Sequence, residues 1–406
     1  MVANRSLGAC LSERLCGLLA TAMMILTLGS TTVSAGPALL FDAGSGKVIY
    51  SEDMDQPWHP ASLTKIMTAY LVFQDLKAGK IALDTKIKCT EAAHKEPPSK
   101  VGLPVGAELS VDLALKALII KSANDVAVML AEHLGPTHDA FIARMNATAK
   151  RLGMTRTQFF NPHGLPHPGQ VTTARDLARL ARAVVTDFPE HAGLWAMQDV
   201  RIGKIRLGTH NGLLKTFEGA DGLKTGFICD SGYNVVASAT RDGTRLIAVV
   251  LGEASGADRT VRAGSLLEHG FQQFGWKMLF NSNTIDNMPL DSDASGPKSV
   301  RHTIASFSCG NRDAARKLKI VRARAKETRV QKLTKAKKDG EQSTAAVATP
   351  AGTAAIKPAP AAGAPKATPA GVKPPAATAP AASPQKAPPA KAPQAAPAVK
   401  KPAPVE

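Results

Sequence analysis

The stretch Asn234-Val-Val-Ala-Ser-Ala-Thr-Arg-Asp-Gly-Thr-Arg-Leu-Ile-Ala-Val-Val-Leu251 holds two apolar runs separated by Arg241-Asp-Gly. An Asp-Gly pair between two strand-like runs is a strong signal for a β-hairpin. Both runs are apolar enough to lie at the centre of a sheet, where both faces are covered. The sequence therefore predicts a central antiparallel hairpin over residues 234–251.

A second hairpin is predicted near the start of the domain, where Ala38-Leu-Leu-Phe-Asp and Lys47-Val-Ile-Tyr-Ser flank a short Gly/Ser stretch. Between the two hairpins the apolar period becomes helical. Helices are expected over residues 112–120, 124–134, 139–152 and 174–186. Strands at both ends of a domain with a helical insert give an α+β architecture, because a doubly wound parallel sheet needs strands that alternate with helices throughout.

Positive charge is concentrated at the end of the 406-residue chain. Residues 311–406 hold 19 Lys and Arg against 5 Asp and Glu, which accounts for +14 of the formal net charge of +17. They contain no Phe, Tyr or Trp, and 15 of the 28 Pro lie at 341–406, so little apolar surface is available to offset chain entropy. We expect a disordered Ala/Pro/Lys-rich tail over 341–406 rather than a nucleic-acid-binding domain.

The tail is preceded by a polar to basic segment, residues 281–340. Its run from Arg312 to Lys338 is either a solvated linker or a weakly amphipathic helix on an anionic surface. The natural partners of the basic tail outside a cell are anionic cell-wall polymers or membrane surfaces, and no nucleic-acid partner is expected.

The first 35 residues are typical of a secretory signal peptide. Arg5 and Arg14 precede an apolar run, and small residues follow up to Ala35. A retained membrane anchor is the alternative, but the run is shorter than the roughly 20 residues that span a bilayer. We therefore expect a folded domain over residues 36–280 in an exported, periplasmic or envelope-associated protein.

Export would leave three cysteines, Cys89, Cys229 and Cys309, which are widely spaced. An oxidising compartment permits one bridge, but the spacing favours free, partly buried cysteines over a disulfide framework. The histidines form no His-Glu-x-x-His motif, so we expect no metal and no cofactor.

Ser62 and Lys65 carry the first chemical signal. They open a nearly all-apolar helix, and a spacing of three residues places the lysine nitrogen one turn from the hydroxyl. Apolar surroundings lower the pKa of a lysine, which makes a neutral base accessible beside a serine nucleophile. Ser-x-x-Lys also occurs at Ser295 and Ser383, but each of those matches contains a Pro and lacks a helix.

Two further short motifs raise the specificity. Ser122-Ala-Asn124 falls between two expected helices, and Lys224-Thr-Gly226 falls on an expected edge strand, where Gly226 would leave space for a ligand backbone. A helix N-cap and a surface lysine are the alternative interpretations of these motifs when each is taken alone.

Together and in this order, the three motifs resemble those of the penicillin-interacting serine enzymes. The neighbouring sequence is similar to low-molecular-mass penicillin-binding proteins, the serine D-Ala-D-Ala carboxypeptidases. The supporting stretches are Pro60-Ala-Ser-Leu-Thr-Lys-Ile-Met-Thr, Ser122-Ala-Asn-Asp-Val-Ala, Asn161-Pro-His-Gly-Leu, Asp221-Gly-Leu-Lys-Thr-Gly and Gly232-Tyr-Asn-Val-Val-Ala-Ser-Ala. The resemblance covers about residues 38–276 and implies a β-lactamase/transpeptidase-like α+β fold.

The resemblance also implies a role for each motif residue. Ser62 would attack the penultimate D-alanine carbonyl of peptidoglycan stem peptides, with Lys65 as base, and β-lactams would act as inhibitors. The remaining implied roles are proton transfer to the leaving group by Ser122, orientation of the acyl chain by Asn124, carboxylate binding by Lys224 and Thr225, and an oxyanion hole formed by the amides of Ser62 and Phe227. Arg259 stands where several relatives place a second carboxylate-binding cation.

The sequence departs from the family at His210, where some relatives have Arg, and in lacking an alternating-strand second domain after Trp276. A β-lactamase is disfavoured because no Glu-x-x-Leu-Asn string occurs. A D,D-endopeptidase and a non-catalytic wall-binding protein remain the alternatives.

Overall fold

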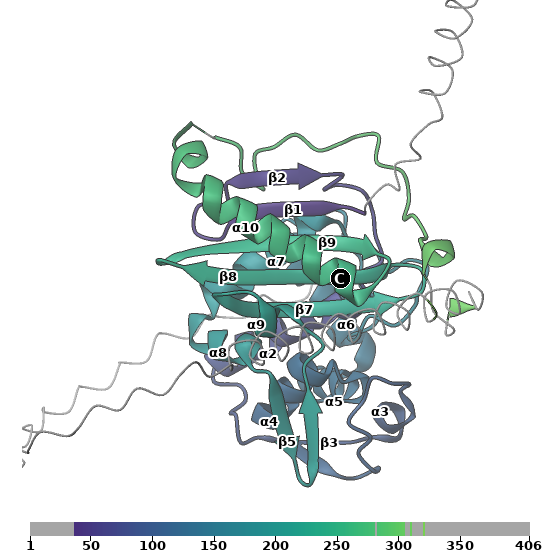
Figure 1. Ribbon diagram of the computed structural model, residues 1–406. Coiled ribbons are helices and arrows are strands. Elements are labelled where there is room, and N and C mark those ends of the chain that lie inside the picture. Colours follow the sequence, from purple (N-terminus) through teal and green to yellow (C-terminus); the bar gives the residue numbers. More distant parts are fainter. Residues whose placement is uncertain (1–35, 281, 305–308, 311–319, 321–406) are drawn as a thin grey trace, which may run out of the picture. The chain divides into compact units, whose positions relative to one another are not determined.

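The computed structural model describes residues 36–280, 282–304, 309, 310 and 320, without the side chains of 276–280. At its centre lies a five-stranded antiparallel sheet in the order β2-β1-β9-β8-β7 (Figure 1). The strands are β1 (Ala38–Asp42), β2 (Val48–Glu52), β7 (Ala220–Ile228), β8 (Gly232–Arg241) and β9 (Thr244–Glu253). Both predicted hairpins are present, and β1 pairs with β9, so the two ends of the domain close the sheet.

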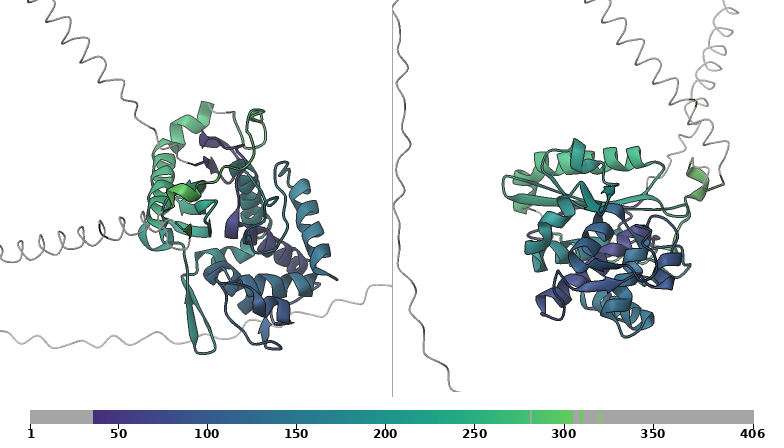
Figure 2. Two further views of the ribbon diagram at one scale, coloured as in Figure 1. Left: turned by 90° about the vertical axis from the view of Figure 1, so that its right-hand side faces the viewer. Right: turned by 90° about the horizontal axis from the view of Figure 1, so that it is seen from below.

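Both faces of the sheet are covered, as the apolar strands require. Helix α10 (Gly256–Phe280) crosses one face and α7 (Ala174–Asp187) lies behind the other (Figures 1 and 2). Alternate residues along a strand point to opposite faces. Accordingly, Ala248 packs in the cluster beneath α10, whereas its neighbour Val249 belongs to the larger core shared with the other helices.

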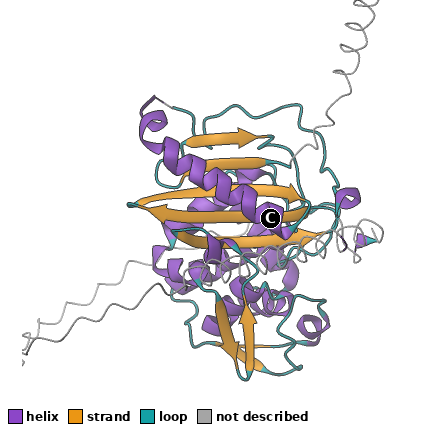
Figure 3. Ribbon diagram, viewed as in Figure 1, coloured by secondary structure: helices purple, strands orange, loops and turns teal. Residues whose placement is uncertain are grey.

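The remaining helices gather below the sheet, on the side of β7 (Figure 3). They are α2 (Lys65–Lys77), α3 (Glu91–Lys95), α4 (Val111–Lys116), α5 (Asn124–Leu134), α6 (His138–Arg151), α8 (Ala192–Ala196) and α9 (Leu213–Thr216). Two small hairpins, β3 (Lys86–Lys88) with β4 (Glu108–Ser110) and β5 (Asp199–Ile202) with β6 (Ile205–Gly208), complete this part. The α+β prediction is confirmed.

Three of the four predicted helices are present, and each has a capping residue or a glycine next to it in the sequence. Helix α5 has the predicted bounds, and α6 and α7 begin where the side chains of Thr137 and Thr173 cap the first turn.

The single helix predicted over 112–120 is wrong. Helix α4 ends at Lys116, a π-helical turn follows over Ala117–Lys121, and Ser122 takes a left-handed conformation with φ of 62°. π-Turns are frequent at functional sites, and a periodicity of apolar residues cannot distinguish them from α-helix.

Residues 282–304 and Cys309 together form what we call the strap. These residues fall in the predicted linker, and in the structure they lie against the body. Ile285 is buried, and Arg175 donates hydrogen bonds to the carbonyls of Ile285, Met288 and Pro289 at 3.1, 2.8 and 2.9 Å. The strap packs because its backbone carbonyls satisfy a cation that the body buries.

Cys229 and Cys309 form a disulfide across 80 residues of sequence. The expectation that the cysteines stay free is therefore wrong for this pair and holds for Cys89, which is free and buried. The pairing depends on the strap returning to the turn between β7 and β8, and no local sequence pattern encodes that return.

The predicted signal peptide, the Arg312–Lys338 segment apart from Ile320, and the tail lie outside the described residues. Within the part that the structure describes, no helix has the length and apolar character needed to cross a bilayer.

The buried ion pair between Arg175 and Asp55 yields a stability prediction. Its atoms lie 2.7 Å apart, and both side chains are at most 2% exposed. In Arg175→Met, Asp55 keeps its charge without its partner, and the free energy of unfolding should fall by about 3–5 kcal/mol. Urea denaturation measures the change. Arg206→Ala, which removes a surface pair with Asp199, is the control and should leave the urea midpoint unchanged; equal midpoints for all three proteins would contradict the prediction.

Candidate active site

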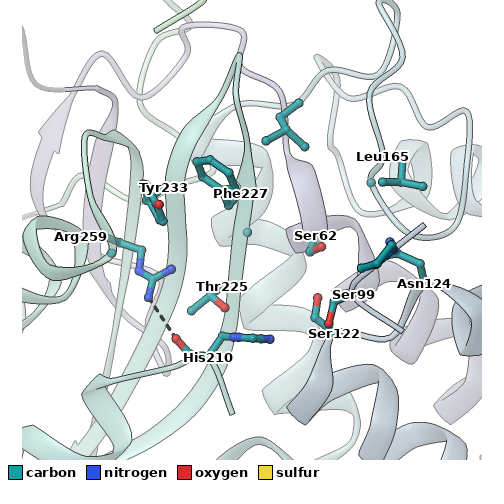
Figure 4. A pocket seen from close by; sticks show the side chains of 15 residues that line it. Ser62, Ser99, Ser122, Asn124, Leu165, His210, Thr225, Phe227, Tyr233 and Arg259 are labelled. Atoms are coloured by element: carbon teal, nitrogen blue, oxygen red, sulfur yellow. Dashed lines mark hydrogen bonds between the residues drawn. The ribbon is translucent and has the colours of Figure 1, made fainter. Parts of the chain in front are cut away.

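A cleft of about 410 Å³ lies between β7 and the helical half, and Ser62 faces into it (Figure 4). Its lining also includes Ser122, Asn124, Thr225, Gly226 and Phe227. The cleft therefore brings together residues from all three motifs that the sequence analysis singled out.

Ser62 lies on a 3₁₀ turn, Ala61–Thr64, that leads directly into α2. The sequence predicts the first turn of a regular helix here, and the tighter turn preserves the predicted proximity of Ser62 and Lys65. The Nζ of Lys65 donates to the Oγ of Ser62 at 3.1 Å. A nucleophile and a base thus stand within hydrogen-bond reach.

Lys65 has two further acceptors, both from distant parts of the chain. Its Nζ donates to Asn124 Oδ1 at 2.8 Å and to the backbone carbonyl of His163 at 2.6 Å. The side chain is fully buried. All three acceptors, including Ser62, are uncharged, so the amine is held in place without a direct counter-ion.

Electrostatics favour a neutral Lys65. Burial lowers the pKa of Lys65 well below its ordinary value, and the nearby charge of Lys224 lowers it further. Glu96 and Asp125 act on this pKa in the opposite direction. The net effect favours the neutral amine, whose two N–H groups suffice for Asn124 and the His163 carbonyl and whose lone pair can then accept the proton of the Ser62 hydroxyl.

Lys224 stands at the opposite wall, on edge strand β7. Its Nζ donates to Ser122 Oγ at 2.9 Å and to the carbonyl of Thr225 at 3.0 Å. Burial, together with the charge of Arg259, lowers the pKa of Lys224 to about 7. The left-handed backbone of Ser122 turns its hydroxyl toward this lysine, which is an example of backbone strain at a candidate functional position.

Gly226 sits where β7 meets the turn that carries Ser62. A Cβ atom added to Gly226 would lie 3.0 Å from the carbonyl oxygen of Pro60 and 3.2 Å from the amide nitrogen of Ser62. The missing side chain thus lets β7 pass close to the turn that carries Ser62, and Gly226 also lines the cleft. Phe227, the next residue on β7, lines the cleft as Ser62 does.

A cluster of cations continues from Lys224 to the outer wall. Arg259, at the start of α10, donates to the carbonyl of His210 at 3.1 Å, and both residues line the cleft (Figure 4). Burial lowers the pKa of Arg259 to about 10, and burial with the charges of Lys224, Lys121 and Arg259 lowers the pKa of His210. This end of the cleft suits an anion.

Sequence reasoning missed several wall residues, which are Pro98, Ser99, Gly164, Leu165 and Tyr233. The Asn161–Leu165 stretch carries the resemblance to the family, but no side-chain pattern in it predicts that the carbonyl of His163 accepts a hydrogen bond from Lys65. Among the described residues, no group of three or more His, Cys, Asp or Glu side chains is placed to hold a metal ion.

Similarity to solved structures defines the class of protein. Penicillin binding protein 5 from Haemophilus influenzae is 36% identical, with a TM-score of 0.57 over 60% of this chain and 73% of that one. Penicillin-binding protein D2 from Listeria monocytogenes, solved in a cefotaxime-bound form, is 31% identical, with a TM-score of 0.54 over 60% of this chain and 99% of that one. The fold is that of the penicillin-binding, transpeptidase-like proteins.

Sequence comparison gives the family. The profile of peptidase family S11, described as D-alanyl-D-alanine carboxypeptidase, matches residues 25–255. D-alanyl-D-alanine carboxypeptidase DacC of Escherichia coli (strain K12) is 40% identical over 255 residues, which are 61% of this chain and 64% of that protein. The chain belongs to the peptidase S11 family, and it spans slightly less than two thirds of the length of the first curated relatives it matches.

Gly164 gives a prediction about the support of this site. It has φ of +88°, and an added Cβ would lie 1.8 Å from the carbonyl oxygen of Ala61. Gly164→Ala should lower the free energy of unfolding by about 3 kcal/mol or more through strain and overpacking. Thermal unfolding measures the loss. Gly193→Ala, whose Cβ would meet nothing within 4 Å, serves as control; a melting temperature for Gly164→Ala as high as that of Gly193→Ala would refute the packing argument.

Proposed function

We propose that this protein is an exported serine D-Ala-D-Ala carboxypeptidase that removes the terminal D-alanine from peptidoglycan stem peptides through an acyl-enzyme on Ser62. The observation that carries the proposal is the hydrogen bond from the buried, depressed-pKa Lys65 to Ser62. Membership of the peptidase S11 family supports the reaction type.

In the proposed reaction, Ser62 Oγ attacks the penultimate D-alanine carbonyl while Lys65 Nζ takes its proton. The amides of Ser62 and Phe227 stabilise the developing oxyanion, a contribution that is typically worth about 3 kcal/mol per donor. Ser122, bonded to Lys224, passes a proton to the nitrogen of the leaving D-alanine. The proton held by Lys65 restores the Ser122 hydroxyl, and water then hydrolyses the ester on Ser62, returning a proton to its Oγ and releasing the shortened peptide as a carboxylic acid.

The substrate would lie along β7. Lys224 and Thr225 bind its terminal carboxylate, and the charge of Arg259 adds to the attraction. Asn124, which donates its own Nδ2 proton to the carbonyl of Pro97 and accepts from Lys65, orients the acyl chain. β-Lactams would be inhibitors, because they present a carboxylate and a reactive carbonyl in the same arrangement; the Listeria relative was solved with cefotaxime bound.

The disulfide supports export, because such bonds persist in oxidising compartments. We propose that residues 1–35 are the export signal, that the catalytic domain begins at Gly36, and that the basic tail binds an anionic cell-wall or membrane surface.

Substitution of the nucleophile tests the reaction. Ser62→Ala should abolish both covalent labelling by a fluorescent penicillin and D-alanine release from a pentapeptide ending in D-Ala-D-Ala. Ser295→Ala, at another Ser-x-x-Lys match, is the control and should behave as the unchanged protein. Labelling retained in Ser62→Ala would overturn the proposal, and labelling without D-alanine release in the unchanged protein would favour an endopeptidase.

The two lysines predict the pH dependence of kcat/KM. Lys65 acts when neutral, so activity should rise with pH through its lowered pKa. Lys224 binds the carboxylate when charged, so activity should fall as pH rises through about 7, its pKa in the free site. Rates of penicillin acylation from pH 5 to 10 measure both limbs.

Lys224→Arg keeps its positive charge through the falling limb near pH 7, because a guanidinium deprotonates only at much higher pH. The falling limb should disappear in this variant even if its overall rate is lower. A falling limb near pH 7 that persists in Lys224→Arg would contradict the assignment to Lys224.

A further inference from the structure

Two of the strap's contacts with the body involve segments that lead to residues lining the cleft. The first is the loop before Ser62. Gln56 Nε2 donates to the carbonyls of Ser295 and Gly296 at 2.8 and 3.0 Å, and the amide of Asp291 donates to Asp55 at 3.1 Å. The loop held in this way leads within six residues to the nucleophile.

The second contact is the turn between β7 and β8, which follows Phe227. Arg301 donates to both carboxylate oxygens of Asp230 at 3.0 and 2.7 Å, and Ser299 Oγ donates to the same carboxylate at 2.9 Å. The disulfide joins Cys229, two residues beyond Phe227, to Cys309. The strap thus makes ionic, polar and covalent contacts with the end of the strand that lines the cleft.

The two contact regions are also joined directly. The indole nitrogen of Trp58 donates to the carbonyl of Ser231 at 3.0 Å, and Asn234 Nδ2 donates to the carbonyl of His59 at 3.1 Å. Trp58 and Asn234 are both buried. The segments that carry the amides of Ser62 and Phe227 are therefore tied to each other and to one common strap.

We propose that the strap positions the oxyanion hole and that the Cys229–Cys309 bond locks it. The inference rests on the proposed function, in which the amides of Ser62 and Phe227 form that hole. Neither cysteine lines the cleft, so the effect acts through the placement of Phe227. Since displacement of a catalytic group by about 1 Å can cost up to about 100-fold in rate, a released turn should slow acylation.

The test uses the full mature chain with Cys229→Ser, Cys309→Ser and the double variant. The acylation rate constant for a labelled penicillin should fall about tenfold, while the dissociation constant of the initial complex stays within about twofold. Because one bond is lost in every case, each single variant should match the double variant. Cys89→Ala, which removes the free buried thiol, is the control and should acylate at the unchanged rate.

Reduction gives an independent measurement on the unchanged sequence. A dithiol such as dithiothreitol transfers two electrons to the bond, leaves thiols on Cys229 and Cys309, and closes to its own cyclic disulfide. The reduced protein should acylate at the rate of the double variant. Affinity for a boronic acid, which mimics the tetrahedral intermediate on Ser62, should fall in parallel with the rate.

Arg301→Gln provides a test that leaves the cysteines intact, and it should also lower the acylation rate with little change in initial binding. If the unchanged protein is not acylated, the proposed function fails. If it is acylated and the cysteine variants match it, the strap inference is overturned. The fraction of unfolded protein in each variant is measured by thermal unfolding. If the fractional loss of acylation rate only equals that unfolded fraction, the strap has a structural role alone and the inference is overturned.

Discussion

The site depends on keeping two lysines buried near one another. Lys65 and Lys224 are both almost fully inaccessible, and removing a charged ammonium from water is costly unless partners replace the water. The acceptors of Lys65 are a hydroxyl, a side-chain amide and a backbone carbonyl. Such neutral groups satisfy the donors without restoring the ordinary pKa that a bonded carboxylate would maintain. The requirement for a reactive amine therefore determines which groups surround it.

This requirement explains the arrangement of the fold. Ser62 and Lys65 can share one helix start, but Lys224 has to approach from a separate wall to leave a cleft between them. The antiparallel sheet supplies that wall as an edge strand, since among the described residues β8 is the one strand that pairs with β7. Gly226 permits β7 to pack directly against the turn that carries Ser62. The buried side-chain amide of Asn234 on β8 donates a hydrogen bond to the carbonyl of His59, in the loop just before that turn. Sheet and helices are thus joined at the position of the nucleophile.

The sequence revealed what is encoded locally. The spacing of Ser62 and Lys65 lies within one helical turn, and Asp242-Gly243 marks the central hairpin, so both could be predicted. The hydrogen bond from Lys65 to Asn124 joins residues 59 apart in the sequence. The third acceptor of Lys65 is the main-chain carbonyl of His163, which no side-chain pattern reveals. The strap is polar and lacks periodicity, so it resembles a linker until the partners of its carbonyls are known. The Cys229–Cys309 pairing depends on that same folding, which is why spacing alone favoured free thiols.

The cations in the cleft also affect one another. Arg259 lowers the pKa of Lys224, and Lys224 in turn lowers the pKa of Lys65. An anion bound at Lys224 favours the ammonium there and offsets its effect on Lys65, because opposite charges screen one another's fields. In the proposed reaction the substrate carboxylate has this role, so its arrival would raise the proton affinity of Lys65 while Ser62 is attacking. A stronger base is then present only when a correctly terminated peptide is bound, which couples recognition of the carboxylate to reactivity at the serine.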